Sequence, residues 1–542
     1  MTALRTFCRA HWWWLASGGI VLLALLLRIA MLIKANWMMD GDEATMAIVG
    51  RHIQLQHERP IFFPGQAYMG AWQAYLSALV FYVAGVSRPA AKAVPLISSL
   101  AFVLSMLLLA RRIYGPKAAL VAGAFAALPS VYLLSATLRL SYPLIDVMAL
   151  GNIILLIAVD SVWRPQPPPR FWLRFLALGL IAGFGFWLHA AIAVFVAPAG
   201  LTLLVRWPRY SLVPGTPLAL AGFVVGAAPV FQFARRHDYT TFDYLLGSSS
   251  DTAQRDFLAV ARHMLDTVLP RIIGVAVPWG PTPTLLQLAI GVPSAAALVY
   301  LAWRVRLAPL AWLRARPQDA TPEAIVALFG LAVVATYVMS RFSVYALLYP
   351  TLDATGRYLA PLGSFLPLAF AGAARDVWNR GSHGRSVAVG GVALLLGATA
   401  VAWASAPGDA VFQSPYFREL PRENKALIRA LDALDVDAVW INHWAGKPLM
   451  FDSDERIAAT DWVDLRVCNG IDRLGANSAR VFADDDPAFV LISSAEMTPL
   501  ERALTERGVR FERVSVDGYV VVHPLDGPVD PASVVQYLWK AC

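Results

Sequence analysis

The stretch that decides the fold covers residues 36–85 and reads NWMMDGDEATMAIVGRHIQLQHERPIFFPGQAYMGAWQAYLSALVFYVAG. It follows a long apolar run and contains three acids near its start, Asp40, Asp42 and Glu43. The sequence Asp-Gly-Asp-Glu is typical of a helix N-terminus, where carboxylates meet the positive end of the helix dipole. The alternating apolar and polar residues that follow suit a helix lying on a membrane surface. The acids are therefore either a solvated helix cap or part of a chemical site at the end of the first span.

The composition is that of a membrane protein. Of 542 residues, 58% are hydrophobic and only 15% are charged, and the mean hydropathy is +0.55. A soluble protein of this length does not need so much apolar sequence. The net charge of +8 could suggest a nucleic-acid partner, but most arginines lie in short loops between apolar runs. That placement indicates positive-inside topology and no nucleic acid.

Apolar runs long enough to cross a bilayer, about 20 residues each, recur along the first 405 residues. The run at 70–86 is excluded, because counting it as a crossing would place every later basic loop outside. Residues 34–92 then form one long first external loop with interfacial helices, and the N-terminus is cytoplasmic. We expect a polytopic α-helical membrane protein with about eleven transmembrane helices, near 13–33, 93–110, 118–135, 143–162, 172–188, 190–205, 213–231, 284–303, 323–340, 358–374 and 386–404.

After residue 405 the composition shifts to charged residues mixed with short apolar runs. We therefore expect two domains, a transmembrane domain over 1–405 and a soluble α/β domain over 406–542 outside the membrane. Cys468 and Cys542 could form a disulfide in an oxidising compartment, or remain free thiols. The patterns predict helices over 423–434 and 500–508, and strands over 437–441, 488–493 and 519–525.

Ionisable residues gather at the predicted outer ends of the spans. The three early acids could deprotonate a hydroxyl or hold a divalent metal ion. Arg139 lies in the second outer loop and could bind a substrate phosphate or a lipid phosphate. Arg357 starts a span from outside, against the positive-inside pattern, so we expect it to bind a phosphate with its forked donors. His189, also at an outer end, is more often a satisfied helix-end residue than a base, and His443 is structural or acceptor-binding.

Five segments together resemble a known group of proteins. They are Asp42-Glu43-Ala44, Arg51-His52-Ile53, FFPGQAYMG at 62–70, RRIYG at 111–115 and GRYLAPL at 356–362. In this order they resemble bacterial membrane glycosyltransferases of the dolichyl-phosphate-mannose–protein mannosyltransferase type, which are relatives of the lipid A aminoarabinose transferase in the GT-C superfamily. The resemblance covers roughly residues 13–375. It implies an inverting transfer of a sugar from a polyprenyl-phosphate donor to an acceptor hydroxyl on a glycan, lipid or protein of the cell envelope, at the outer face of the bacterial inner membrane.

The resemblance also implies roles for single residues. Asp42 would be the general base, with Asp40 and Glu43 in the same catalytic group, and Arg357 and Arg139 would stabilise the leaving phosphate. No cofactor is expected and the nearest relatives need no catalytic metal, although a divalent metal stays open. The residues expected to bind substrate are Gln66, Tyr68, Tyr142, Asp146, Tyr358 and His189, of which Gln66 and Tyr68 could instead be interfacial anchors.

Three other classes of function remain as alternatives. A transporter or flippase of lipid-linked glycans would need ionisable groups near the middle of the bilayer and often an internal repeat. The charges lie mainly at the outer edge, and the sequence has no repeat. A polysaccharide polymerase would also use outer loops but gives no reason for the early acidic pair. A non-catalytic assembly protein would be supported if replacing Asp42 left activity unchanged.

Overall fold

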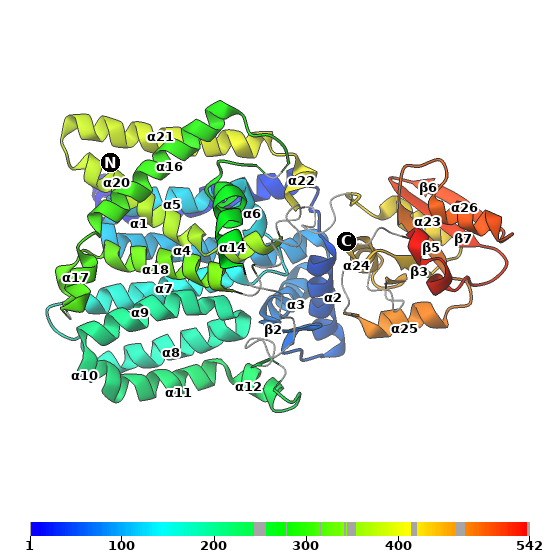
Figure 1. Cartoon of the computed structure of the whole chain (residues 1–542), viewed down its shortest axis with the longest axis horizontal. Coiled ribbons are helices and arrows are strands. Elements are labelled where there is room, and N and C mark those ends of the chain that lie inside the picture. The colour runs from blue at the N-terminus through cyan, green and yellow to red at the C-terminus, as the bar shows by residue number, and fades with distance from the viewer. Residues whose placement is uncertain are drawn as a thin grey trace.

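The structure is a computed structural model that describes residues 2–239, 241–242, 256–277, 279–314, 316–340, 343, 354–412, 420–461 and 472–538. A bundle of long helices forms one end of the molecule and a small sheet domain forms the other (Figure 1). The predicted disulfide cannot be described, because Cys468 and Cys542 lie outside these residues.

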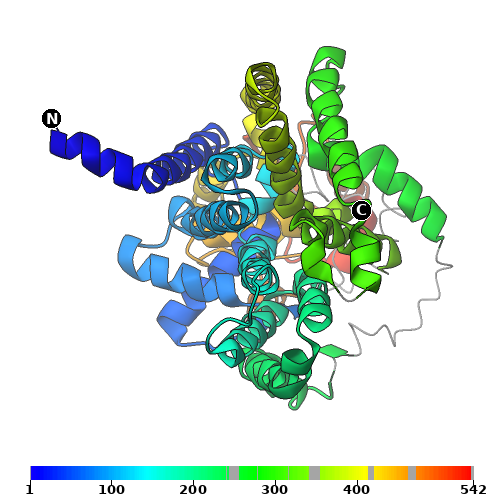
Figure 2. The same cartoon turned by 90° about the vertical axis from the view of Figure 1, so that its left-hand side faces the viewer.

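Most of the bundle consists of long apolar helices. Six are long and apolar enough to cross a membrane, and up to eight if each of two bent pairs is one span. Seen from the end remote from the sheet domain, the helices run nearly towards the viewer and the start of α1 projects from one edge (Figure 2). The main helices are α1 (Thr2–Lys34), α4 (Arg88–Tyr114), α5 (Pro116–Ala127), α6 (Val131–Thr137), α7 (Leu144–Val162), α8 (Phe171–Leu188), α9 (Ala193–Arg206), α11 (Thr216–Gly226), α12 (Ala228–Ala234), α16 (Thr284–Arg304), α17 (Ala308–Leu313), α18 (Glu323–Met339), α20 (Leu362–Trp378) and α21 (Ser382–Ser405).

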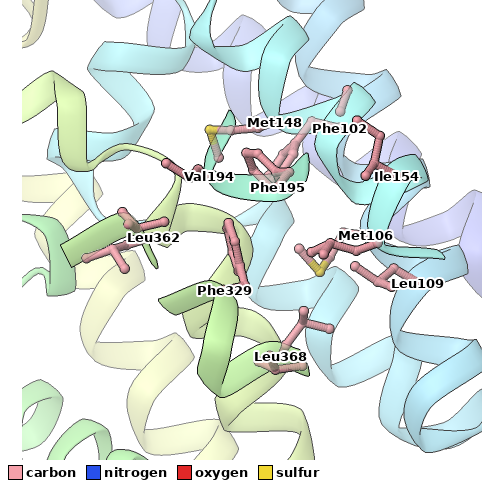
Figure 3. Close-up of a cluster of buried hydrophobic side chains, with 14 of the residues drawn as sticks. Phe102, Met106, Leu109, Met148, Ile154, Val194, Phe195, Phe329, Leu362 and Leu368 are labelled. Carbon is pink, nitrogen blue, oxygen red and sulfur yellow. The ribbon is translucent and has the colours of Figure 1, made fainter. Parts of the chain in front are cut away.

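The comparison with the predicted spans is close but not complete. Eight predicted spans coincide with the six long helices and the two bent pairs, α5 with α6 and the segment Pro208–Gly226 with α12. The other three fall on α9, α18 and α20, which have 14, 17 and 17 residues. These three helices are deeply packed: the rings of Phe195 in α9 and Phe329 in α18 lie 4.5 Å apart, next to α4, α7 and α20 (Figure 3). Helices surrounded by protein are less constrained in length by lipid than helices at the rim.

Two helices and a hairpin lie across the end of the bundle that faces the sheet domain (Figure 1). They are α2 (Gly41–Gln56), the strands β1 (Phe62–Phe63) and β2 (Gln66–Gly70), and α3 (Trp72–Ala84). At 1.5 Å per residue the 13 residues of α3 span about 20 Å, short of the roughly 30 Å hydrocarbon core. This agrees with the exclusion of residues 70–86 from the predicted spans.

The C-terminal part contains a five-stranded mixed sheet in the order β4-β3-β5-β7-β6. The strands β3, β4 and β5 are parallel, and β7 is antiparallel to both β5 and β6. The mixed α/β domain predicted from the sequence is confirmed. Its elements are α23 (Lys425–Ala433), β3 (Ala438–Ile441), α24 (His443–Asp452), β4 (Ala458–Thr460), α25 (Gly475–Ala483), β5 (Ala488–Ile492), α26 (Pro499–Glu506), β6 (Phe511–Val516), β7 (Tyr519–Pro524) and α27 (Val535–Leu538), preceded by the short α22 (Gly408–Phe412).

Five elements of this domain were not predicted: α24, α25, α27, β4 and β6. The strand β4 has only three residues, and β6 is an edge strand whose polar residues are exposed, so neither shows a clear apolar run. The β6–β7 hairpin turns through Asp517 and Gly518, both with positive φ (46° and 84°). An Asp-Gly pair suits this turn, because Asp tolerates and Gly readily adopts the left-handed conformation.

Candidate active site

The three early acids surround the first turn of α2. Asp40 is the N-cap: its Oδ1 accepts a hydrogen bond from the Glu43 backbone N–H at 2.9 Å, and Glu43 Oε2 accepts one from the Asp40 backbone N–H at 3.3 Å. This capping box satisfies backbone donors that the helix itself cannot pair. The cap expected from Asp-Gly-Asp-Glu is therefore present, but both side chains are fully buried rather than solvated.

Two of the acids form ion pairs with basic residues of the bundle. Asp40 forms an ion pair with Arg139. Glu43 forms one with Lys92 near the start of α4, and its Oε1 also accepts a hydrogen bond from the Leu140 backbone N–H at 2.9 Å. Burial and the neighbouring carboxylates raise the pKa of Asp40, against the lowering effect of Arg139. Asp40 and Glu43 thus fix the start of α2 to the bundle.

The third acid, Asp42, faces the C-terminal domain instead. Its Oδ1 lies 3.3 Å from Nη2 of Arg473 and 3.6 Å from Nε2 of His443, and all three side chains are buried. Burial alone would raise the pKa of Asp42, but Arg473 and His443, with a contribution from Arg357, hold it at about 2. Arg473 also donates to the Pro64 carbonyl at 2.7 Å. Asp42 is therefore an ionised carboxylate held between the bundle and the sheet domain.

Arg357 contributes a guanidinium on the bundle side of Asp42. It belongs to a 3-10 helix (Ala354–Leu359) just before α20, and its charge acts on Asp42. Its Nη1 donates to the Tyr142 hydroxyl at 2.6 Å and its Nη2 to the Tyr358 hydroxyl at 3.4 Å. The His189 ring lies 6.0 Å from the Tyr358 ring. These contacts bring together four residues predicted as donor- or substrate-binding, and one of them, Arg357, acts electrostatically on the predicted base.

The remaining predicted residues lie at the margin of this group or outside it. Tyr68 on β2 is 6.3 Å from His189, ring to ring, and Gln66 begins the same strand. Asp146 is bound by Gln73 Nε2 at 2.9 Å and Ser98 Oγ at 2.6 Å. Arg139, predicted to bind phosphate, forms an ion pair with Asp40.

Two basic residues of the site, Lys92 and Arg473, were not predicted from the sequence. Lys92 carried a usable signal, since an ionisable residue at the end of a membrane span is a functional candidate by default. Arg473 carried none, because it is a single arginine in a soluble domain, more than 400 positions from Asp42. His443 was singled out without a role, and only the fold places it beside Asp42.

Ion pairs around the site hold the C-terminal domain to α2 and α4. Arg51 Nη1 lies 3.1 Å from Asp454 Oδ1, His52 Nε2 lies 3.0 Å from Glu455, and Arg88 pairs with Asp452. The hydrogen bond that His52 donates to the Glu455 carboxylate raises the pKa of His52 above its ordinary value. Burial raises the pKa of Glu455, but His52 outweighs burial and lowers it.

No cluster of three or more His, Cys, Asp or Glu side chains suited to a metal ion occurs within the described ranges.

Comparison with known proteins supports the fold. No family model and no curated protein matches this sequence. Among solved structures the match is to the GT-C membrane glycosyltransferase fold. The crystal structure of ArnT from Cupriavidus metallidurans bound to undecaprenyl phosphate aligns with a TM-score of 0.58 at 13% identity, covering 94% of this chain and 98% of that chain. The apo state of ArnT gives a TM-score of 0.57 at 14% identity over the same shares of the two chains. The oligosaccharyltransferase of Archaeoglobus fulgidus also aligns, with a TM-score of 0.48 at 13% identity over 96% of this chain and 76% of that chain, which is too low to support an argument. The predicted resemblance to GT-C enzymes is confirmed at the level of the fold.

Proposed function

We propose that this chain is an inverting glycosyltransferase that moves a sugar from a polyprenyl-phosphate donor to a hydroxyl of a cell-envelope acceptor. The observation that carries the proposal is that an ionised carboxylate, Asp42, and a half-buried guanidinium, Arg357, whose charge acts on it, lie at the end of the bundle that faces the sheet domain. The likeness to ArnT, a protein crystallised with undecaprenyl phosphate, supports a lipid phosphate as the donor group.

Arg357 suits the leaving phosphate, and Asp42 suits the acceptor hydroxyl. The acceptor hydroxyl attacks the anomeric carbon while the bond from that carbon to the phosphate oxygen breaks, and direct displacement inverts the anomeric centre. Negative charge grows on the leaving phosphate, where Arg357 would stabilise it through charge-assisted hydrogen bonds. Asp42 would accept the hydrogen bond of the hydroxyl and so orient it for attack.

The aromatic residues around Arg357 suit the sugar. Tyr142 and Tyr358 hold the guanidinium through their hydroxyls, and His189 and Tyr68 continue the same group of rings. We assign these four aromatic residues to binding of the donor sugar. We place Gln66 and Asp146 at the margin of the donor-binding site.

The other early acids have a different part in this proposal. Asp40 and Glu43, with Arg139 and Lys92, position α2 and therefore Asp42, without contact to the substrate. The charge of the leaving phosphate is met by Arg357, so we propose a reaction without a resident metal or other cofactor.

Membrane topology follows from the same proposal. Eleven crossings, with α9, α18 and α20 among them, leave the N-terminus in the cytoplasm and place residues 34–92 outside. The domain boundary stays near 405–406, and the C-terminal domain then lies at the outer face of the bacterial inner membrane with the site between it and the lipid. There it could meet a glycan, lipid or protein acceptor.

Binding of undecaprenyl phosphate to the purified protein in detergent tests the donor assignment. We expect saturable binding that weakens at least tenfold in Arg357→Ala, because a charged hydrogen-bonding partner of the phosphate is lost. Arg510→Ala is the matched control, since Arg510 pairs with Asp526 on the exposed part of the sheet domain and should leave the affinity unchanged. Equal affinities in all three proteins, or no binding by folded protein, would contradict the assignment.

A further inference from the structure

His443 brings an imidazole from the C-terminal domain to the first turn of α2. It is the first residue of α24 and is 2% exposed, and its Nε2 lies 3.6 Å from Asp42 Oδ1. Within the described residues neither of these two atoms has a hydrogen-bond partner. Arg473, at 3.3 Å, compensates the charge of Asp42 Oδ1, but the buried His443 Nε2 without a hydrogen bond costs about 1–3 kcal/mol, which a proton shared with Asp42 would recover.

Gly41 makes the close approach of His443 possible. A Cβ atom at position 41 would lie 2.7 Å from the His443 backbone oxygen and 3.0 Å from its Nε2. Real Cβ atoms do not come so close to backbone, so any other residue at 41 would push His443 away from Asp42. The contact between α2 and α24 is thus built around the imidazole.

Asp42 alone is a poor final acceptor for a proton. Arg473 Nη2 lies 3.3 Å from its Oδ1, and a carboxylate paired with a guanidinium orients a hydroxyl well but has little affinity for the proton. Imidazole is the side chain that ordinarily exchanges protons near neutral pH. A neutral ring with its proton on Nδ1 leaves Nε2 free to accept one.

We propose that His443 acts through Asp42 in the transfer reaction and receives the proton that the acceptor hydroxyl gives up to Asp42. This inference rests on the proposed glycosyltransferase function. As the new bond between the hydroxyl oxygen and the anomeric carbon forms, the O–H bond breaks and the proton passes by way of Asp42 Oδ1 to His443 Nε2. The bond from the anomeric carbon to the phosphate oxygen breaks, and the polyprenyl phosphate leaves with that electron pair. The imidazolium later gives its proton to water.

Charges of both signs surround Asp42 and His443. An imidazolium at 443 would lie beside the Asp42 carboxylate and near Asp461, whose Oδ2 accepts a hydrogen bond from the His443 backbone N–H at 3.2 Å. The ionisable groups that act on Asp42 or His443 from the surrounding elements are Arg473, Arg357, Arg139, Asp40 and Asp461.

The test compares His443→Gln with the wild-type protein in an assay for release of undecaprenyl phosphate from a panel of undecaprenyl-phosphate sugars, with cell-envelope extract as acceptor. Glutamine keeps a hydrogen-bonding side chain but cannot carry the proton. We expect kcat to fall about 100- to 10,000-fold while the KM for the donor changes little. The acid limb of log kcat/KM against pH, which an imidazole base produces, should be lost.

Gly41→Ala is an independent second variant, because it keeps every functional group and only displaces His443. We expect it to lower kcat as well, while Gly390→Ala, whose new methyl meets open space, does not. His523→Gln is the matched histidine control. His523 belongs to β7 and pairs with Asp486, remote from Asp42, so replacing His523 should leave the rate unchanged.

The outcomes separate the two proposals. If wild-type protein releases undecaprenyl phosphate and His443→Gln does so at the same rate with the same acid limb, the role of His443 is wrong and the glycosyltransferase function stands. If His443→Gln lowers kcat but keeps the acid limb of the wild type, His443 is structural only. If wild-type protein binds undecaprenyl phosphate but releases none from any donor, the proposed function is wrong and the inference is lost with it.

Discussion

Arg473 of the sheet domain lies 3.3 Å from the Asp42 carboxylate at the start of α2, although the two residues belong to opposite ends of the chain. The same guanidinium donates to the Pro64 carbonyl and lies over the Phe63 ring, 4.6 Å from its centroid. The C-terminal domain is therefore part of the site and not only a cover, because Arg473 neutralises the carboxylate of Asp42, the residue expected to be the general base.

Removing Arg473 should destabilise the protein through Asp42. Arg473→Ala leaves a buried carboxylate without its nearest guanidinium, which typically costs about 3–5 kcal/mol. Asp42→Asn in the same chain should recover part of that loss, since the charge that needed compensation is gone. Denaturant unfolding in detergent of the wild type, both single variants and the double variant gives the coupling energy; a coupling near zero would show that the ion pair contributes nothing.

The buried pair of Glu43 and Lys92 should behave as a structural element. Both side chains are fully buried, so Glu43→Gln leaves the Lys92 ammonium without its partner and should lower the melting temperature strongly. Lys92→Met in addition should restore much of the stability, because no buried charge remains. Thermal unfolding measures both effects. If Glu43→Gln instead left the melting temperature unchanged and abolished only transfer, Glu43 would act in the chemistry.

Docking of the sheet domain should depend on pH through His52 and Glu455. The pKa of His52 is raised, so its contribution is complete below the ordinary value of about 6.5 and is lost as pH rises through the raised value. The pKa of Glu455 is lowered, so its contribution is present above the ordinary value of about 4.5 and is lost as pH falls through the lowered value. Stability from this pair is therefore greatest between about pH 4.5 and 6.5.

The measurement is the melting temperature between about pH 6 and pH 9. We expect a fall in the wild type that is smaller in Glu455→Gln and unchanged in Glu506→Gln, a matched control on the exposed side of α26. Identical profiles for all three proteins would exclude the His52–Glu455 pair as the source.

Tyr142 should act on donor affinity through Arg357. Tyr142→Phe removes the hydroxyl that accepts from Arg357 Nη1 and leaves the ring in place, so the guanidinium loses one restraint. A hydrogen bond of this kind contributes about 0.5–1.5 kcal/mol, which corresponds to a loss of about twofold to tenfold in affinity for undecaprenyl phosphate. Tyr210→Phe, at an exposed tyrosine of the segment Pro208–Tyr210, is the control. A stronger effect from Tyr210→Phe than from Tyr142→Phe would contradict this role.

The part of the fold that could be predicted is the part set by local patterns. Apolar runs and arginine placement located the helices that are long and apolar enough to cross a membrane, and the charges predicted that residues 70–86, the region of the short α3, do not cross. The Asp-Gly-Asp-Glu pattern predicted the cap of α2. The apolar runs also predicted spans at α9, α18 and α20, which have 14, 17 and 17 residues and are packed inside the bundle.

The part that could not be predicted depends on long-range contacts. Nothing local distinguishes Asp42 from Asp40 and Glu43, which stand in the same turn. Their roles separate only when Arg139 and Lys92 from the bundle meet two of them and Arg473 and His443 meet the third.

The most direct test of the central claim measures release of undecaprenyl phosphate from a panel of undecaprenyl-phosphate sugars by wild-type protein and by Asp42→Asn. Both proteins are assayed below their melting temperatures, and both are first shown to bind undecaprenyl phosphate with the same affinity. The account predicts acceptor-dependent release with at least one donor by the wild type and at least a 100-fold slower release by Asp42→Asn. Release at equal rates by the two proteins would contradict it.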